Sequence, residues 1–357
     1  MTRTIALMTG GGDCPGLNAA IRTVVRVAIR EYGYRVIGIE DGYEGLIEGR
    51  YRELTTNDTR GILRVGGTML GASNRTNPFV YVGPGLKTAR DASEEALATL
   101  AAIGADSMVV IGGDGTLYLT QQFASGRFPV VGIPKTIDND VHGTDYSIGF
   151  DTCVTTVTDA IDKVHTTAES HHRVVVIEVM GRTAGWVALF SGVAGGADIV
   201  LIPERGYTID QIMQKIDDRT ATGRRFTIIV VAEGVAAPDG EALYVSQAGA
   251  EHAWKLGGIG NALAASLSQR CEQEVRAIVL GHVQRGGSPT PADRLLATQL
   301  AFTAVEALHN GHTGVMAGGQ GNNAVLVPFE QVAIGPRLVH DDHPVLSAAE
   351  SMGVYVG

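Results

Sequence analysis

The chain has 357 residues, a length that suggests two lobes or one large α/β unit rather than one average domain. Hydrophobic residues make up 45% and charged residues 18% of a chain with 47 glycines, which excludes a disordered or fibrous protein. The formal net charge is −10 and no basic run is present, which disfavours nucleic-acid binding. Because this charge repels anionic metabolites, binding one would require local clusters of basic residues.

The amino-terminal residues run straight into a short apolar stretch and then glycines, unlike a leader peptide. No apolar stretch is long enough to span a membrane. The three cysteines, Cys14, Cys153 and Cys271, lie far apart without CxxC spacing, which predicts buried thiols rather than disulfides or a zinc site. We therefore expect a cytoplasmic protein with no membrane or nucleic-acid partner.

Short, continuous apolar runs alternate along the chain with helical patterns. The predicted strands are 4–8, 108–111, 130–133, 174–179, 199–202, 227–232 and 277–280. An amphipathic helix is predicted over 18–30 and ends before Gly33, and another over 91–103 has Asp91 and Glu94 at the spacing of a capping box. This pattern predicts a doubly wound α/β architecture with parallel sheets and ligands at the carboxyl ends of strands. The Gly/Asn-rich stretch 317–323 is predicted to be a surface loop.

The first segment with chemical potential is a glycine-rich turn after the strand at 4–8, running through Gly10, Gly11 and Gly12 into the helix at 18–30. Backbone amides of such a turn, together with a helix N-terminus, can cradle phosphate. A tight strand-to-helix turn that needs positive φ explains the glycines equally well.

The second segment is GGDGT at 112–116, also after a predicted strand. Its glycines let a phosphate chain approach the backbone, and Asp114 could hold a magnesium ion through water. The alternative of an Asp-Gly hairpin turn is weaker, because a helix is the expected next element.

The third segment is PKTIDND at 134–140. Helix capping explains one of its aspartates but not Lys135, Thr136, Asp138 and Asp140 together. A phosphotransferase needs a carboxylate to accept the hydroxyl proton, a second carboxylate to organise the metal, and a cation for the transferred group.

Together with further segments, these three resemble the 6-phosphofructokinase family in the family's order. The matching segments are GGDCPGLN (11–18), DGYEGL (41–46), GGDGT (112–116), PKTIDND (134–140), SHHR (170–173), MGR (180–182) and GHVQRGGSP (281–289). The similarity extends from about residue 4 to about residue 335.

The resemblance implies two doubly wound, Rossmann-like lobes with mainly parallel sheets and an active site in the cleft between them. The donor-binding lobe would comprise 1–147 and about 285–334, and the sugar-binding lobe 148–284 and about 335–357. It also implies a homodimer or homotetramer with shared active sites, since relatives bring the counterparts of Arg173 and Arg276 into the neighbouring subunit's site.

The activity that the resemblance implies is Mg²⁺-dependent phosphoryl transfer from ATP to the 1-hydroxyl of fructose 6-phosphate, a step of glycolysis. Asp138 would be the general base, and Asp114 and Asp140 would organise the metal. The donor side would comprise Gly11, Tyr43, Arg75, Gly115, Thr116 and Lys135. The sugar phosphate would contact Thr136, Asp138, Arg173, Met180, Gly181, Arg182, Glu233, Arg276, His282 and Arg285.

Two positions govern donor choice in the family, and in this chain they favour different donors. Gly115 is the small residue of nucleotide users, where pyrophosphate users carry an aspartate. Lys135 stands where pyrophosphate users have lysine and where short bacterial ATP enzymes have glycine. ATP is favoured because the steric block is absent, and pyrophosphate stays the alternative donor.

Two readings from other classes rank lower. A dinucleotide-binding oxidoreductase would need GxGxxG and a suitably spaced acidic residue, and both are missing. A non-catalytic regulatory subunit of the same fold is disfavoured because Asp114, Asp138 and Asp140 are all present.

Overall fold

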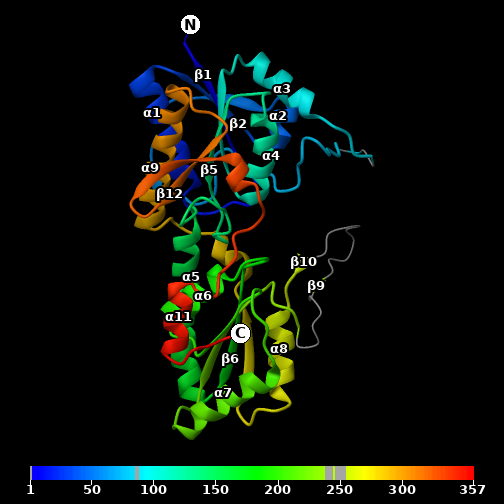
Figure 1. Cartoon of the computed structure of the whole chain (residues 1–357), viewed down its shortest axis with the longest axis vertical. Coiled ribbons are helices and arrows are strands. Elements are labelled where there is room, and N and C mark those ends of the chain that lie inside the picture. The colour runs from blue at the N-terminus through cyan, green and yellow to red at the C-terminus, as the bar shows by residue number, and fades with distance from the viewer. Residues whose placement is uncertain (1, 84, 86–87, 238–243, 246–254) are drawn as a thin grey trace. The chain divides into compact units, whose positions relative to one another are not determined.

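The computed structural model describes residues 2–83, 85, 88–237, 244–245 and 255–357. The chain forms two compact units (Figure 1), unit 1 from Met1–Thr152 and Arg285–Pro336 and unit 2 from Cys153–Gln284 and Arg337–Gly357. The assignment of donor binding to one lobe and of sugar binding to the other stays a prediction.

Unit 1 is built on a seven-stranded sheet of order β13-β12-β5-β4-β1-β2-β3. The edge strands β3 and β13 pair antiparallel with their neighbours, and the other pairings are parallel. In Figure 1, α1 and α9 lie together on one face and α2, α3 and α4 on the other, as doubly wound folds require. Its elements are β1 (Thr4–Thr9), α1 (Leu17–Tyr32), β2 (Arg35–Ile39), α2 (Tyr43–Glu48), β3 (Tyr51–Leu54), the 3-10 helix η1 (Ile62–Arg64), α3 (Ser93–Ala102), β4 (Ser107–Gly112), α4 (Asp114–Ala124), β5 (Val130–Pro134), α9 (Pro291–His309), β12 (Val315–Gln320), β13 (Asn323–Pro328) and α10 (Phe329–Val332).

Unit 2 is built on a five-stranded parallel sheet of order β11-β6-β8-β7-β14. Its elements are β6 (Val174–Val179), α6 (Trp186–Ala194), β7 (Ile199–Leu201), α7 (Ile209–Ala221), β8 (Thr227–Ala232), β9 (Tyr244–Val245), β10 (Lys255–Leu256), α8 (Ile259–Ser268), β11 (Val275–Val279), α11 (Pro344–Ser351) and β14 (Tyr355–Val356). Helix α5 (Phe150–His171) and the 3-10 helix η2 (Gly281–Arg285) include residues of both units.

The continuous apolar runs are the strands that the sequence predicts, displaced by a few residues at their ends. Every residue of β1, β5, β6 and β8 is buried, which explains why these strands show no alternation of polar and apolar residues. The α/β prediction with mainly parallel sheets is confirmed. Cys14, Cys153 and Cys271 are free thiols; Cys14 and Cys153 are buried as expected, whereas Cys271 is half-buried.

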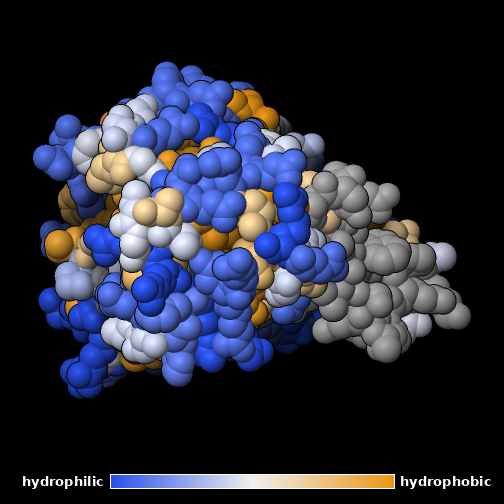
Figure 2. Space-filling view, turned by 90° about the horizontal axis from the view of Figure 1, so that it is seen from below, coloured by the Kyte–Doolittle hydropathy of each residue, from blue (hydrophilic) through white to orange (hydrophobic). Residues whose placement is uncertain are grey.

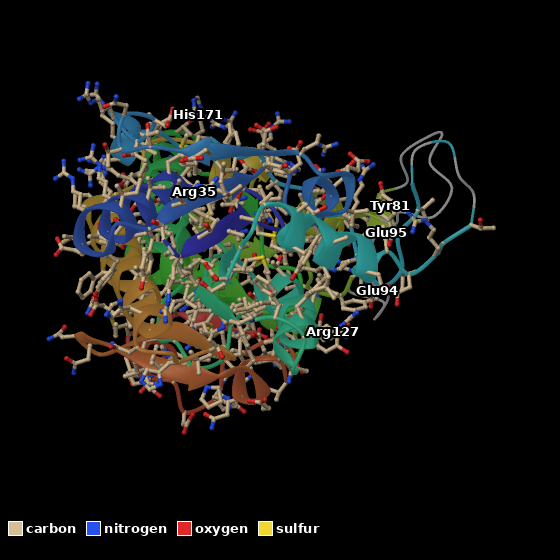
Figure 3. All side chains as sticks on the ribbon, turned by 90° about the horizontal axis from the view of Figure 1, so that it is seen from above. Arg35, Tyr81, Glu94, Glu95, Arg127 and His171 are labelled. Carbon is tan, nitrogen blue, oxygen red and sulfur yellow. The ribbon has the colours of Figure 1, made fainter. Side chains whose placement is uncertain are left out.

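Two local predictions are wrong. The stretch 317–323 is mostly strand, because β12 and β13 form a hairpin around Gly321 and Asn322; Gly318 lies so close to the carbonyl of Gly143 that a side chain would not fit. The capping box at α3 does not form, because the N-cap is Ala92. Asp91 instead accepts a hydrogen bond from the Ser93 N–H at 2.8 Å, and Glu94 pairs with Arg127 (Figure 3).

The surface seen in Figure 2 is largely hydrophilic, with hydrophobic residues in small patches. In the described part of the chain, no helix is both long and apolar enough to cross a membrane.

A buried carboxylate ties the start of α9 to the start of α5. Asp293 is 1% exposed and accepts hydrogen bonds from the N–H of Gly149 at 2.8 Å and from the N–H and hydroxyl of Thr152 at 2.8 and 2.5 Å. It therefore satisfies amide groups that α5 cannot bond within itself.

We expect Asp293→Ala to lower the free energy of unfolding by about 2–4 kcal/mol, because it leaves buried donors without an acceptor. Urea denaturation measures this loss. The control is Asp162→Asn, which changes an exposed carboxylate on α5. A loss no larger than that of the control would contradict this role for Asp293.

Candidate active site

Three polar segments meet at the carboxyl edge of the unit 1 sheet. Strands β1, β4 and β5 are neighbours and run parallel, so the segments that follow them lie side by side. The Gly10 N–H donates to the carbonyl of Ile111 at 2.9 Å, and the Lys135 N–H donates to that of Gly112 at the same distance. The three motifs that are separate in sequence thus form one continuous edge.

The glycines after β1 permit close packing around Thr116. A Cβ atom at Gly10 would lie 2.6 Å from the Thr116 methyl group, and one at Gly112 would clash with the same side chain. Gly11 has φ +77° and donates its N–H to the carbonyl of Ser73 at 3.2 Å. The expected need for positive φ therefore holds at Gly11. Gly10 and Gly112 have a different reason, because Thr116 fills the space that a side chain would need.

The side chain of Lys135 hydrogen-bonds to the backbone of this glycine turn. Its side chain is 3% exposed, and its ammonium group donates to the carbonyl of Gly10 at 2.9 Å and to that of Gly12. Burial lowers the pKa of Lys135, and the positive charge of Arg285 lowers it further. The two hydrogen bonds from the lysine thus stabilise the conformation of the turn and place its ammonium group next to the turn's backbone.

The loop after β5 is held rigidly around Asp138. Asn139 adopts a left-handed conformation with φ 53°, accepts from the Ser147 N–H at 2.9 Å and donates to the carbonyl of Asp145 at 3.1 Å. The Ser147 hydroxyl donates to the carbonyl of Thr136 at 2.7 Å. A strained residue fixed by its surroundings is characteristic of a functional loop.

Asp138 combines the environment of a general base with two nearby cations. Its N–H donates to the Thr136 hydroxyl at 3.1 Å. Burial raises the pKa of the Asp138 carboxyl, while the charges of Arg285 and Lys135 oppose that rise. A carboxylate with a raised pKa accepts a proton more readily than an ordinary aspartate does.

Arg285, which is distant in sequence, contacts the same glycine turn. A Cβ atom at Gly12 would lie 2.8 Å from its guanidinium, which also donates to the carbonyl of Asp13 at 3.3 Å. Unit 1 therefore gathers Arg285, Lys135 and Asp138 in one electrostatic group, although the chain carries a net negative charge.

The carboxylates predicted to organise a metal lie in adjoining segments. A Cβ atom at Gly113, next to Asp114, would lie 3.3 Å from the Lys135 carbonyl. Burial raises the pKa of Asp114, and His142, two residues beyond Asp140, opposes that rise. No group of three or more His, Cys, Asp or Glu residues in the described regions could hold a metal by itself. Two carboxylates fit Mg²⁺, which completes its coordination with water and substrate phosphates.

The predicted donor-side residues occupy different environments. Gly115 lies in the first turn of α4, and a Cβ atom there would meet nothing within 4 Å. Tyr43 is 3% exposed, hydrogen-bonds the Thr120 hydroxyl at 3.0 Å and stacks on Phe123, so its ring belongs to the core of unit 1. Arg75 is exposed and follows Ser73, which contacts Gly11.

In unit 2, most of the predicted sugar-binding residues meet at the carboxyl edge of the sheet. Strands β11, β6 and β8 are adjacent, and the residues that follow them are His282, Met180–Arg182 and Glu233. The Glu233 N–H donates to the carbonyl of Val179 at 2.8 Å, and the Gly234 N–H donates to that of Gly181 at 3.0 Å.

Arg173 and Arg276 do not join that group. Arg173 directly precedes β6, and Arg276 lies opposite Val175 near the start of β11, so both belong to the amino edge of the same sheet. Because a strand rises about 3.3 Å per residue, the amino and carboxyl edges are separated by the full length of the strands.

Sequence reasoning missed Gln284, which connects two of the sugar-binding motifs. Gln284 is fully buried, accepts from the Met180 N–H at 3.1 Å and donates to the Gly281 carbonyl at 3.0 Å. Its place within the GHVQRGGSP segment is a signal that could have identified it. Asn139 was missed in the same way, between Asp138 and Asp140.

Comparison with known proteins agrees with this geometry. The family model described as phosphofructokinase matches residues 4–308. The chain is 44% identical over 358 residues to ATP-dependent 6-phosphofructokinase 2 of Clostridium perfringens, covering 99% of this chain and 98% of the relative. It is 46% identical over 330 residues to the pyrophosphate–fructose 6-phosphate 1-phosphotransferase of Amycolatopsis mediterranei, covering 92% and 93%.

Among solved structures, phosphofructokinase from Saccharomyces cerevisiae matches with a TM-score of 0.76 and 32% identity over 92% of this chain. The chain spans 45% of the length of that yeast chain. The family match and the full-length similarities lead to one conclusion: the chain belongs to the phosphofructokinase family.

Proposed function

We propose that this protein transfers the γ-phosphoryl group of ATP to the 1-hydroxyl of fructose 6-phosphate, giving fructose 1,6-bisphosphate and ADP. Asp138 accepts the proton of that hydroxyl as the oxygen attacks phosphorus, and the bond from the γ-phosphorus to the bridging oxygen breaks. The observation that carries this proposal is the half-buried Asp138, whose N–H donates to the Thr136 hydroxyl and whose raised pKa is opposed by the charges of Arg285 and Lys135. The phosphofructokinase family match supports the acceptor.

Membership in this family implies a divalent metal, and we propose Mg²⁺. Asp114 and Asp140 would hold it with the donor phosphates, and when bound it would offset the negative charge of the transferred group. Thr136 would contact that group from the loop that Asn139 and Ser147 brace.

ATP is the proposed donor because of the space beside Gly115. A side chain there would project from the first turn of α4 into a volume that contains no protein atom within 4 Å. That volume can accept the α-phosphate of a nucleotide, and Gly11, Thr116, Tyr43 and Arg75 are the proposed neighbours of the donor. The amide groups of α4 favour a phosphate at this end of the helix.

A pyrophosphate donor is the second candidate, favoured by Lys135 and by the Amycolatopsis relative. The ammonium group of Lys135 donates to two carbonyls of the glycine turn, which supports a bracing role rather than donor selection.

The test is fructose 1,6-bisphosphate formation from fructose 6-phosphate and Mg²⁺, with ATP, ADP or pyrophosphate as separate donors. We expect product with ATP. Product with pyrophosphate alone would assign donor choice to Lys135 and its surroundings. No product with any donor, in protein shown to be folded, would favour a regulatory subunit of the same fold.

We propose that the carboxyl edge of the unit 2 sheet binds the sugar phosphate, and Arg285 stays a predicted contact of that ligand. Its contacts there would be Met180, Gly181, Arg182, Glu233 and His282. Arg173 and Arg276 lie at the opposite edge of that sheet, so we propose that they serve the site of a second copy in a homodimer or homotetramer. Arginine forks suit this task because they bind phosphate bidentately.

The pH dependence of activity tests the electrostatic role of Arg285. Because Asp138 must be ionised to accept a proton and its pKa is raised, kcat/KM should fall with decreasing pH through a value above that of an ordinary aspartate, about 3.9. Arg285→Gln removes a charge that opposes the rise, so this acid limb should move to higher pH. The KM for the sugar phosphate should also increase.

The control is Arg127→Gln, which removes an equal charge at the surface near α3. Its pH profile should match that of the wild type. An acid limb that stays in place in Arg285→Gln would contradict the coupling between Arg285 and Asp138.

A further inference from the structure

Glu274 contacts both of the arginines at the amino edge of the unit 2 sheet. Its Oε2 accepts a hydrogen bond from Arg173 Nε at 2.5 Å, and its Oε1 accepts one from the Arg276 guanidinium. Each carboxylate oxygen therefore binds a different arginine. The two guanidinium groups, which are 103 positions apart in the chain (276 minus 173), lie on either side of one carboxylate.

The backbone places these three side chains by regular strand pairing. Glu274 directly precedes β11, and its carbonyl accepts from the Val174 N–H at 3.1 Å. Parallel pairing then sets Val275 opposite Val174 and Arg276 opposite Val175. Because this bond continues the pairing of the sheet, it holds the backbone of Glu274 next to Val174, the residue that follows Arg173.

The arrangement leaves much of Arg276 and a smaller part of Arg173, whose side chain is 26% exposed, available to a ligand. The Arg276 side chain is 62% exposed and β11 is an edge strand, so this group faces outward from unit 2. Among the residues that the structure describes, Glu274 is the only hydrogen-bond partner found for the two guanidinium groups, and it occupies one N–H of each. The remaining N–H donors and a net charge of one positive unit suit a phosphate monoester.

Glu274 stays ionised at neutral pH. The hydrogen bond from Arg173 lowers the pKa of its carboxyl, and the charges of both arginines act in the same direction. Without this carboxylate, two neighbouring guanidinium groups would repel each other, and each would recover the rotamer freedom of a long side chain.

We propose that Glu274 is a positioning residue, which holds Arg173 and Arg276 side by side for the phosphate group of a sugar phosphate bound to a second copy of the chain. The inference rests on the proposed function, which brings these arginines to the neighbouring site. Its physical basis is preorganisation: side chains that are ordered before binding lose less conformational entropy when the phosphate arrives.

Glu274→Gln tests this role, because it keeps the shape of the side chain and removes its charge. We expect the KM for fructose 6-phosphate to rise about three- to tenfold, the range for losing the order of one or two long side chains. The kcat and the KM for the donor should not change. Glu274→Asp, which restores the charge on a shorter side chain, should recover part of the loss.

The matched control is Asp210→Asn. Asp210 makes a comparable exposed ion pair with Arg270 at 2.6 Å in the same unit, and nothing assigns that pair to a site. Its kinetics should equal those of the wild type. Light scattering on each variant reports whether the assembly is intact.

Several outcomes overturn the proposal. An unchanged KM in Glu274→Gln would mean that the arginines need no positioning, and a lowered KM would mean that Glu274 competes with phosphate. A fall in kcat together with loss of assembly would indicate a purely structural role. The absence of any recovery in a folded Glu274→Asp protein would also count against it.

Arg173→Ala and Arg276→Ala separate this proposal from the proposed function. If neither variant raises the KM for the sugar phosphate, the two arginines do not serve the substrate site. The part of the proposed function that assigns them to a second copy's site is then wrong. If they raise it and Glu274→Gln does not, only the role of Glu274 fails. In a Glu274→Gln/Arg276→Ala double variant, the effect of Glu274→Gln should be smaller than in the wild type.

Discussion

Replacing Asp138 with asparagine should lower kcat by roughly 10²–10⁴-fold while leaving the KM values for donor and sugar phosphate close to those of the wild type. Asparagine has the shape of aspartate, and its backbone N–H can still donate to the Thr136 hydroxyl. What is lost is the ability to accept the proton of the attacking hydroxyl. Steady-state kinetics with both substrates varied measures this split between kcat and KM.

The reason for so large an effect lies in the surroundings of Asp138. Burial raises the pKa of its carboxyl, and Arg285 and Lys135 stabilise the ionised form that accepts the proton. The control is Asp58→Asn, a change to an exposed carboxylate of unit 1. Near-normal turnover of Asp138→Asn would remove it from the role of base.

Replacing Gly115 with aspartate should reduce kcat/KM for ATP by about 10²- to 10³-fold and spare any activity with pyrophosphate. A carboxylate at this position would enter the space proposed for the α-phosphate, and repulsion between like charges about 4 Å apart accounts for a loss of that size. The fold should tolerate the change, because a Cβ atom at Gly115 has no neighbour within 4 Å. An acidic residue in the first turn of α4 also suits the helix.

Two variants separate the charge from the space that it occupies. Gly115→Ala adds a methyl group without charge and should have a smaller effect on ATP. Gly206→Asp places the same carboxylate at another open glycine, in unit 2, and should leave donor kinetics unchanged. Donor competition assays give the comparison directly. Full ATP activity in Gly115→Asp would show that the space beside Gly115 is not the donor site.

The fold class and the strands that carry the motifs follow from local patterns in the sequence. Buried parallel strands such as β1 and β5 carry continuous apolar runs, so the local sequence pattern predicts them without the structure. Gly33, which ends α1 in a left-handed conformation, was predicted for the same reason. The hairpin of β12 and β13 is not predicted from the sequence. Its Gly318 is required by close contact with the backbone of Gly143, which is far away in sequence.

Which candidate residues lie close together depends on the folded chain and not on local sequence patterns. The sequence offers Lys135 as a donor contact, which stays a prediction; only the structure shows that its ammonium group also donates to the carbonyls of Gly10 and Gly12. It offers Arg173 and Arg276 alongside Met180 and His282, whereas strand direction places the two arginines at the other edge of the sheet. Residue type and spacing specify chemistry, but which groups meet depends on strand order and on contacts between distant segments, and neither is encoded locally.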